Sequence, residues 1–312
     1  MMNNYRFQLE PYKTMKTRYY CPAPHCGREK TFSRYIDNET QSHLHNNVGR
    51  CNREIKCGYH YTPKQYFQDN KLHRNYSNSI PLKSRFTQPI SIPVSFIDSK
   101  VFKASLKGYE TNQLVNFLIQ RFGYKITKEM ISRYFIASSK YWPGSTVFWQ
   151  IDAQGRLRTG KIMLYDSRSG KRVKKPRNHI YWVHKALNNS VFELSQCLFG
   201  EHLLKDRTRP VAVVESEKTA VIASAYLPQF IWVATGGLSN LSKEKCSILK
   251  GRNVTLFPDL NGFEKWNDKA KELSLIASVT VSNLLELKAT DMEKKQGLDL
   301  ADYLVRYNLN RF

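Results

Sequence analysis

The chain has no apolar run approaching the roughly 20 residues that a membrane-spanning helix needs, and its first residues contain no hydrophobic segment typical of a signal peptide. It also lacks the Gly-x-x-x-x-Gly-Lys-Ser/Thr motif of helicases and the Gly-x-Gly-x-x-Gly motif of dinucleotide-binding domains. No Ser/His/Asp arrangement can be placed by spacing. We therefore expect no membrane role and a cytoplasmic protein whose cysteines are reduced or bound to metal.

Acidic residues are scarce. Asp and Glu number 26 against 49 Lys and Arg, so the formal net charge is +23. Such an excess favours a polyanionic partner, with nucleic acid first and an anionic membrane surface a distant second. A hydrophobic content of 41% is typical of a folded protein, and 312 residues can form two or three small domains.

Cysteines occur as two pairs near the start of the chain. The second cysteine of each pair is followed by glycine, and residues 30–36 between the pairs alternate like a strand. Two such cysteine turns joined by a hairpin predict a zinc ribbon that binds structural Zn²⁺. We favour four cysteine ligands, although His25 or His60 could replace one of them. The four are Cys21, Cys26, Cys51 and Cys57.

The sequence predicts four segments, of which the last, residues 206–312, is described below. Residues 1–67 form the ribbon, and its aromatic stretch 59–66 could stack on unpaired bases or simply pack the ribbon. Residues 68–105 read as a linker because they are polar and punctuated by proline. Residues 106–205 hold two helices followed by a basic antiparallel sheet. The second helix is expected to begin with Thr127 as its N-cap.

The basic sheet is expected within residues 145–185, where three strand-like runs are separated by turns. Between residues 158 and 177 this segment contains eight Lys and Arg but a single acid, Asp166. A solvated face is the ordinary interpretation of such a run, but we favour a track for a phosphate backbone. The residues predicted to form that track are Arg158, Lys161, Arg168, Lys171, Arg172, Lys174, Lys175 and Arg177.

In residues 206–312, apolar strands alternate with short helices, which predicts a parallel sheet. Glu215 follows the strand at 211–214, and Asp259 follows the strand at 253–257. Ligands bind such sheets at the carboxyl ends of the strands, and converging carboxylates suit Mg²⁺. The fold class is therefore α+β and multidomain, with a zinc ribbon, a mixed helical and antiparallel region and an α/β domain.

The last domain resembles the TOPRIM domain of primases, topoisomerases and some nucleases. Glu215 matches that family's metal-binding Glu, Gly236-Gly237 its glycine turn, and Asp259 the first Asp of its Asp-x-Asp. Asn261 stands at the second Asp and is a weaker, neutral ligand. Asp299 or Asp302 could complete the site, or could instead cap and flank the last helix. Lys218 could contact a phosphate or be an exposed helix lysine.

The order of domains is similar to bacterial and phage-type primases, and more closely to primase-like proteins of bacterial mobile elements. That resemblance implies primer synthesis on single-stranded DNA from nucleoside triphosphates, with Mg²⁺ or Mn²⁺, in replication or mobilisation of a mobile element. It also implies a separate helicase partner. The alternatives are a DNA-binding protein that has lost turnover, suggested by Asn261, and a TOPRIM nuclease.

Overall fold

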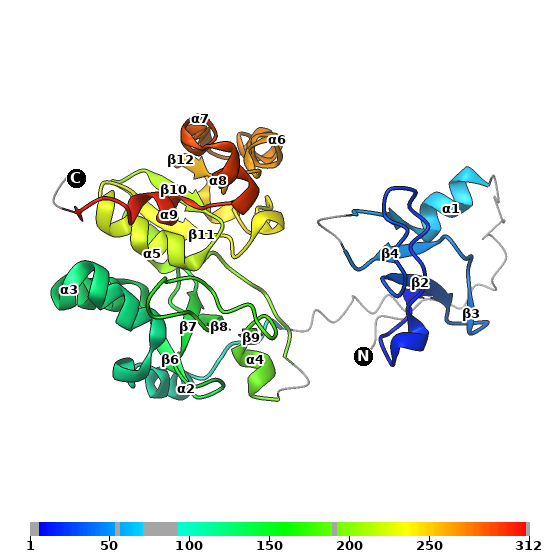
Figure 1. Ribbon diagram of the computed structural model, residues 1–312, viewed down its shortest axis with the longest axis horizontal. Coiled ribbons are helices and arrows are strands. Elements are labelled where there is room, and N and C mark those ends of the chain that lie inside the picture. Colours follow the sequence, from blue (N-terminus) through cyan, green and yellow to red (C-terminus); the bar gives the residue numbers. More distant parts are fainter. Residues whose placement is uncertain (1–5, 54–56, 71–92, 189–191, 310–312) are drawn as a thin grey trace. The chain divides into compact units, whose positions relative to one another are not determined.

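The computed structural model describes residues 6–53, 57–70, 93–188 and 192–309. The chain divides into two compact units, Met1–Pro89 and Ile90–Phe312, and Figure 1 shows the elements of each. The domain boundaries at 67, 105 and 205 remain predictions. Most of the predicted linker, residues 71–92, lies outside the described residues, and its end contains helix α2 (Ser99–Ser105).

The first unit is built on antiparallel strands in the order β1-β2-β4-β5, with β3 pairing β2. It ends in helix α1, which begins with a capping box between Thr62 and Gln65. The core is small and consists of Cys21, Ala23, Phe32 and Cys51. The elements are β1 (Phe7–Leu9), η1 (Met15–Thr17), β2 (Phe32–Asp37), β3 (Ser42–His43), β4 (Gly49–Cys51), β5 (His60–Tyr61) and α1 (Pro63–Asp69).

The second unit opens with α2, the short helix η2 (Tyr109–Thr111) and the long helix α3 (Gln113–Tyr134). The two predicted helices are one element with a break at Gly123, whose φ of +77° interrupts the helical backbone. The prediction that Thr127 is an N-cap was wrong, since Thr127 is buried inside α3. Asn112 caps the helix instead, accepting a bond from the Val115 amide.

An antiparallel sheet follows in the order β6-β7-β8-β9. Its strands are β6 (Ala137–Ser139), β7 (Ser145–Ile151), β8 (Leu157–Met163) and β9 (Ile180–Trp182). The three expected strands are present, and β6 is an additional edge strand. Because alternate residues of a strand face opposite sides, Ile162 joins a core with Val147 and Trp149. Its neighbours Lys161 and Met163 face the other side of the sheet.

The C-terminal sheet is parallel, with strand order β11-β10-β12-β13. The three expected strands are confirmed, and β13 is a fourth. The strands are β10 (Val211–Val214), β11 (Ile231–Ala234), β12 (Asn253–Phe257) and β13 (Ser278–Val281). The helices of the unit's second half are α4 (Val183–Ala186), α5 (Glu217–Tyr226), α6 (Phe263–Leu273), α7 (Leu284–Lys288), α8 (Asp291–Gln296) and α9 (Leu300–Leu304), with η3 (Glu201–Lys205), η4 (Leu238–Asn240) and η5 (Ser247–Leu249).

Both faces of the parallel sheet are covered (Figure 1). Ala212 and Val214 of β10 belong to one core with α5 and α9, whereas Val211 and Val213 belong to another with Trp266 of α6. Burial on both faces explains why β10 is uniformly apolar. In the described ranges, no helix is both long and apolar enough to cross a membrane.

Candidate functional site

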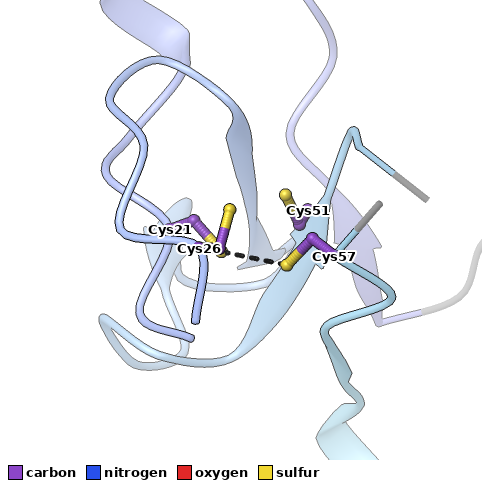
Figure 2. A group of neighbouring side chains, drawn as sticks. All are labelled: Cys21, Cys26, Cys51 and Cys57. Carbon is purple, nitrogen blue, oxygen red and sulfur yellow. Dashed lines mark hydrogen bonds between the residues drawn. The ribbon is translucent and has the colours of Figure 1, made fainter. Parts of the chain in front are cut away.

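The four cysteines predicted as metal ligands lie together in the first unit, with their ligand atoms within 4.8 Å of one another. Figure 2 shows the four side chains gathered from two segments that are far apart in sequence, with Cys51 at the end of β4. Four sulfurs at about 2.3 Å from zinc form a tetrahedron with edges of about 3.8 Å. The Sγ atoms of Cys21 and Cys57 are 3.7 Å apart, so this cluster fits structural zinc.

The two histidines left as alternatives have other partners. His25 Nε2 lies 2.9 Å from the backbone oxygen of Cys57, and His60 Nε2 lies 3.0 Å from the Tyr35 hydroxyl. The thiols differ in acidity: burial raises the pKa of Cys21 to about 12, whereas the backbone amide of Arg28 lowers that of Cys26 to about 6.

The aromatic stretch after the cluster packs the ribbon. Tyr59 meets Phe32 edge-on with ring centroids 5.8 Å apart, and its hydroxyl donates to the Asn47 carbonyl at 3.0 Å. Tyr66 stacks on His45 at 5.3 Å. These contacts agree with the packing interpretation of residues 59–66.

In the second unit, Glu215 and Asp259 lie at the carboxyl ends of the neighbouring strands β10 and β12. The Asp259 amide donates to Glu215 Oε1 at 3.3 Å. Gly262 makes this proximity possible, because a Cβ there would lie 2.9 Å from both Glu215 Oε1 and the Asp259 carbonyl. The strand order thus brings together two acids that lie 44 positions apart in sequence.

Both carboxyl groups are poorly hydrated. Burial raises the pKa of Glu215 to about 7, and burial, with the adjacent Glu215, raises that of Asp259 to about 9. Asp259 Oδ1 is buried and has no hydrogen-bond partner among the described residues. A buried carboxylate oxygen without a partner is costly unless a proton or a cation satisfies it.

Asp299, Asp302 and Lys218 lie beside this pair. The Lys218 ammonium is 3.8 Å from Asp299 Oδ2 and 3.7 Å from Asp302 Oδ1. The two aspartates form a capping box at the start of α9, and Asp299 also accepts a 2.9 Å bond from the Thr219 hydroxyl. Asp299 therefore caps the helix, as one interpretation held, while facing the first turn of α5.

Asn261 follows Asp259 by two positions, and its side-chain amide donates to the Lys294 carbonyl at 2.6 Å. The Asn261 backbone has a φ of +68°, and its backbone N–H donates to Glu286 Oε1 at 3.1 Å. The residue is exposed and tied to α7 and α8.

The acids suit a hydrated divalent ion better than a tightly bound one. Among the described residues, the four cysteines are the one group of three or more His, Cys, Asp or Glu with ligand atoms close enough to hold an ion. Mg²⁺, however, is commonly held by one or two carboxylates together with water and substrate phosphates. The unpartnered oxygen of Asp259 next to Glu215 fits such a site.

Lys161, predicted as a phosphate contact, is instead 7% exposed and faces the parallel-sheet half of this unit. Its ammonium donates to both oxygens of Glu217, at 3.1 and 3.2 Å, and to the Gly236 carbonyl at 3.1 Å. Glu217 is 1% exposed. This buried ion pair joins the antiparallel sheet to the glycine turn and to the first turn of α5.

The remaining predicted phosphate contacts, apart from Arg158, lie in the loop between β8 and β9. Most are exposed, Arg172 is half-buried, and none has a carboxylate within ion-pair distance in the described part of the chain; they are Arg168, Lys171, Arg172, Lys174, Lys175 and Arg177. We call these residues the basic loop. Arg158 lies elsewhere and pairs with Asp152 at 2.7 Å.

Glu217 and Lys245 were not among the predicted site residues. The signal for Glu217 was a second acid directly after a buried strand, at the start of the following helix. Lys245 Nζ donates to the Thr235 carbonyl at 2.9 Å, and burial lowers its pKa. It borders an open polar pocket of about 390 Å³. Isolated lysines and serines give no pattern that would locate such a pocket.

Fold and sites together define a zinc-ribbon protein with an α/β body, in which an acidic sheet edge and a basic loop belong to the same unit. Residues 112–260, just under half of the chain, match the family model described as Domain of unknown function (DUF6371). Residues 5–72 match a family described as a zinc beta-ribbon finger. No protein with a curated function matches the sequence.

The solved structures that the chain resembles are bacterial and phage primases. The primase fragment of the bacteriophage T7 primase-helicase is 17% identical, with 90% of this chain and 98% of that chain covered and a TM-score of 0.38. The E. coli primase catalytic core is 12% identical over 66% and 81%, with a TM-score of 0.40. The Aquifex aeolicus primase, with its zinc-binding and RNA polymerase domains, is 12% identical over 96% and 80%, with a TM-score of 0.33. Likenesses this distant carry no argument about activity.

Proposed function

We propose that this protein is a primase-like nucleotidyltransferase that makes short primers on single-stranded DNA. The observation that carries the proposal is the acidic edge of the parallel sheet. There a buried oxygen of Asp259 has no partner among the described residues and lies beside Glu215. Such a pair is suited to hold a divalent cation in contact with a bound phosphate.

Glu215 and Asp259 are the proposed ligands of Mg²⁺ or Mn²⁺. That ion would supply neutralisation of the nucleotide phosphates and activation of the primer hydroxyl. The described residues prepare the edge for it: Gly262 leaves room for the Glu215 carboxylate, and Thr219 orients Asp299. Lys218 already neutralises part of the charge of Asp299 and Asp302. Glu215 and Asp259 are therefore the best candidate ligands for an ion.

The start of the basic loop lies near Glu217 and Asp299, beside this edge. Tyr165, at the start of the loop, is buried, and burial together with the charges of Glu217 and Asp299 raises its pKa well above the usual range. The Arg172 charge acts on the same hydroxyl in the opposite direction. We assign the loop cations to the template phosphates, and the zinc ribbon to gripping the template strand. Use in a mobile element and a helicase partner belong to the same proposal.

The test is primer synthesis on single-stranded DNA with labelled nucleotides and Mg²⁺ or Mn²⁺. Glu215→Gln removes the charge with almost no change of shape and is expected to abolish product while leaving DNA binding nearly intact. Glu272→Gln is the control and should be fully active, because Glu272 is exposed on α6 and, among the described residues, forms an ion pair with Lys269 alone. Unchanged synthesis by Glu215→Gln would refute the assignment of the site.

A non-catalytic DNA-binding protein is the second candidate, and the geometry of Lys218 favours it. An ammonium between two acids can stand in for a cation, and Asn261 is tied to Lys294. Such a protein would bind DNA with strong salt dependence and be indifferent to Mg²⁺ and to Glu215→Gln. Metal-dependent nicking of plasmid DNA without nucleotides would instead favour the nuclease alternative.

A further inference from the structure

A cluster of aromatic rings lies at the end of the antiparallel sheet from which the basic loop leaves. In an antiparallel sheet of this order, the connection from β6 to β7 and the connection from β8 to β9 emerge at the same end. The first connection carries Tyr141 and Trp142. The second is the basic loop, which closes at His179 and leads into Tyr181 of β9.

The rings contact one another directly. Tyr141 stacks on Tyr181 with centroids 4.5 Å apart and planes 10° from parallel. Trp142 meets Tyr141 edge-on at 4.7 Å and His179 edge-on at 5.1 Å. This cluster therefore connects the basic loop to the short loop that carries Tyr141.

Support and exposure are divided among the rings. Trp142 and Tyr181 are half-buried and pack against the core that contains Val147 and Ile162. Tyr141 is 44% exposed, although it is a large ring at the end of a well-packed sheet. The core thus holds the ring of Tyr181, Tyr181 holds that of Tyr141, and Tyr141 presents aromatic surface to solvent.

A positive charge acts on Tyr141. Burial and the Tyr181 hydroxyl raise the pKa of Tyr141, and the positive charge of Arg177 opposes them, so this guanidinium lies within electrostatic range of the ring. The acid within the basic loop, Asp166, accepts bonds from the amides of Arg168 and Ser169 and from the Ser169 hydroxyl. The surface therefore combines a flat ring with cations that no carboxylate neutralises within the described residues.

We propose that Tyr141, backed by Tyr181 and Trp142, is a stacking site for an unpaired base of a single-stranded nucleic acid whose phosphates lie along the basic loop. Stacking requires a supported ring with an accessible surface, and the backbone requires nearby cations; both are present at one end of one sheet. A double-stranded ligand does not fit, because its bases are already stacked on one another. The inference rests on the proposed function for the identity of the strand.

The experiment measures equilibrium binding of the full chain to two single strands of equal length, one of thymidine nucleotides and one with abasic sites throughout. The wild type should bind the thymidine strand more tightly. Base–aromatic stacking contributes about 1–3 kcal/mol per base, so Tyr141→Leu is expected to weaken that binding by about fivefold to 150-fold. Its binding of the abasic strand should not change, and Tyr141→Phe should retain wild-type binding of both strands.

Tyr124→Leu is the matched control, because Tyr124 is 70% exposed on α3 and no ring of the described residues stacks on it. It should bind both strands like the wild type. Circular dichroism melting curves check that Tyr141→Leu is folded. Equal affinity of the wild type for the two strands, or an equal loss on both in Tyr141→Leu, would overturn the stacking site. If primer synthesis is normal but either of these binding results is found, the stacking site is wrong and the proposed function stands. If synthesis is absent but binding depends on the bases through Tyr141, the proposed activity is wrong and the stacking site stands. A wild type that binds neither strand rejects both the activity and the stacking site.

Discussion

The buried ion pair between Lys161 and Glu217 gives the sharpest test of the fold. Lys161→Met keeps the length of the side chain but removes its charge, and leaves the Glu217 carboxylate, only 1% exposed, without its counter-ion. The Gly236 carbonyl loses its donor as well. Removing one partner of a buried pair costs about 3–5 kcal/mol.

For a domain of this size class, each kcal/mol lowers the melting temperature by roughly 2–4 °C. Lys161→Met is therefore expected to melt about 6–20 °C below the wild type. The assay is chemical and thermal unfolding of the full chain, followed by circular dichroism and tryptophan fluorescence. Lys171→Met is the matched control: Lys171 is exposed, so its unfolding free energy should stay within about 0.5 kcal/mol of the wild type.

A double variant separates the pair from its surroundings. Lys161→Met with Glu217→Met removes both charges and should recover part of the stability, because the second substitution eliminates the unpaired carboxylate. The reasoning is refuted if Lys161→Met is as stable as the wild type, or if the double variant loses the sum of the two single losses. A stable Lys161→Met with a weaker salt dependence of DNA binding would instead support the sequence-based interpretation of Lys161 as a phosphate contact.

Three further predictions concern the cysteine cluster and the acidic edge of the parallel sheet. Cys51→Ser, or a strong chelator, should remove zinc and unfold the ribbon, while the second unit should melt unchanged. The Cys197→Ala variant, whose substitution lies outside the cluster, should keep its zinc. Metal analysis and unfolding curves test this, and full retention of zinc by Cys51→Ser would contradict the four-cysteine site. Burial raises the pKa of Glu215 to about 7 and of Asp259 to about 9, so the folded chain holds protons that the unfolded chain has lost above about pH 5. Without metal, stability should therefore fall as the pH rises from about 5 to about 9, and Mg²⁺ should reverse the loss. A thermal-melt profile unaltered by Asp259→Asn would contradict this. Gly262→Ala should displace the Glu215 carboxylate and abolish primer synthesis in a chain that still binds DNA, since its Cβ would lie 2.9 Å from Glu215 Oε1; full activity would show that the carboxylate does not need this position.

Local patterns in the sequence determined most of the secondary structure and the ribbon. The uniformly apolar run at 211–214, the glycine turn and the paired cysteines each depend on neighbouring residues, so they can be interpreted without knowing the fold. The proximity of Glu215 and Asp259 could also be predicted from the sequence, because the carboxyl ends of parallel strands share one edge of the sheet whatever the strand order. The N-cap assigned to Thr127 failed because a single glycine, Gly123, breaks α3 earlier and tertiary packing buries Thr127.

Only the tertiary structure decided which charged groups meet. Lys161 and Glu217 are 56 positions apart, and Thr219 and Asp299 are 80 apart, so no periodicity links them. In sequence, Lys161 belongs to the same basic run as Lys171, yet strand alternation turns one toward a buried carboxylate, whereas the other lies exposed in the loop beyond the strand. A run of charges specifies how much charge a segment carries. Which cations reach solvent depends on the face of the sheet each one occupies and on what packs against that face, and packing is a property of the folded chain.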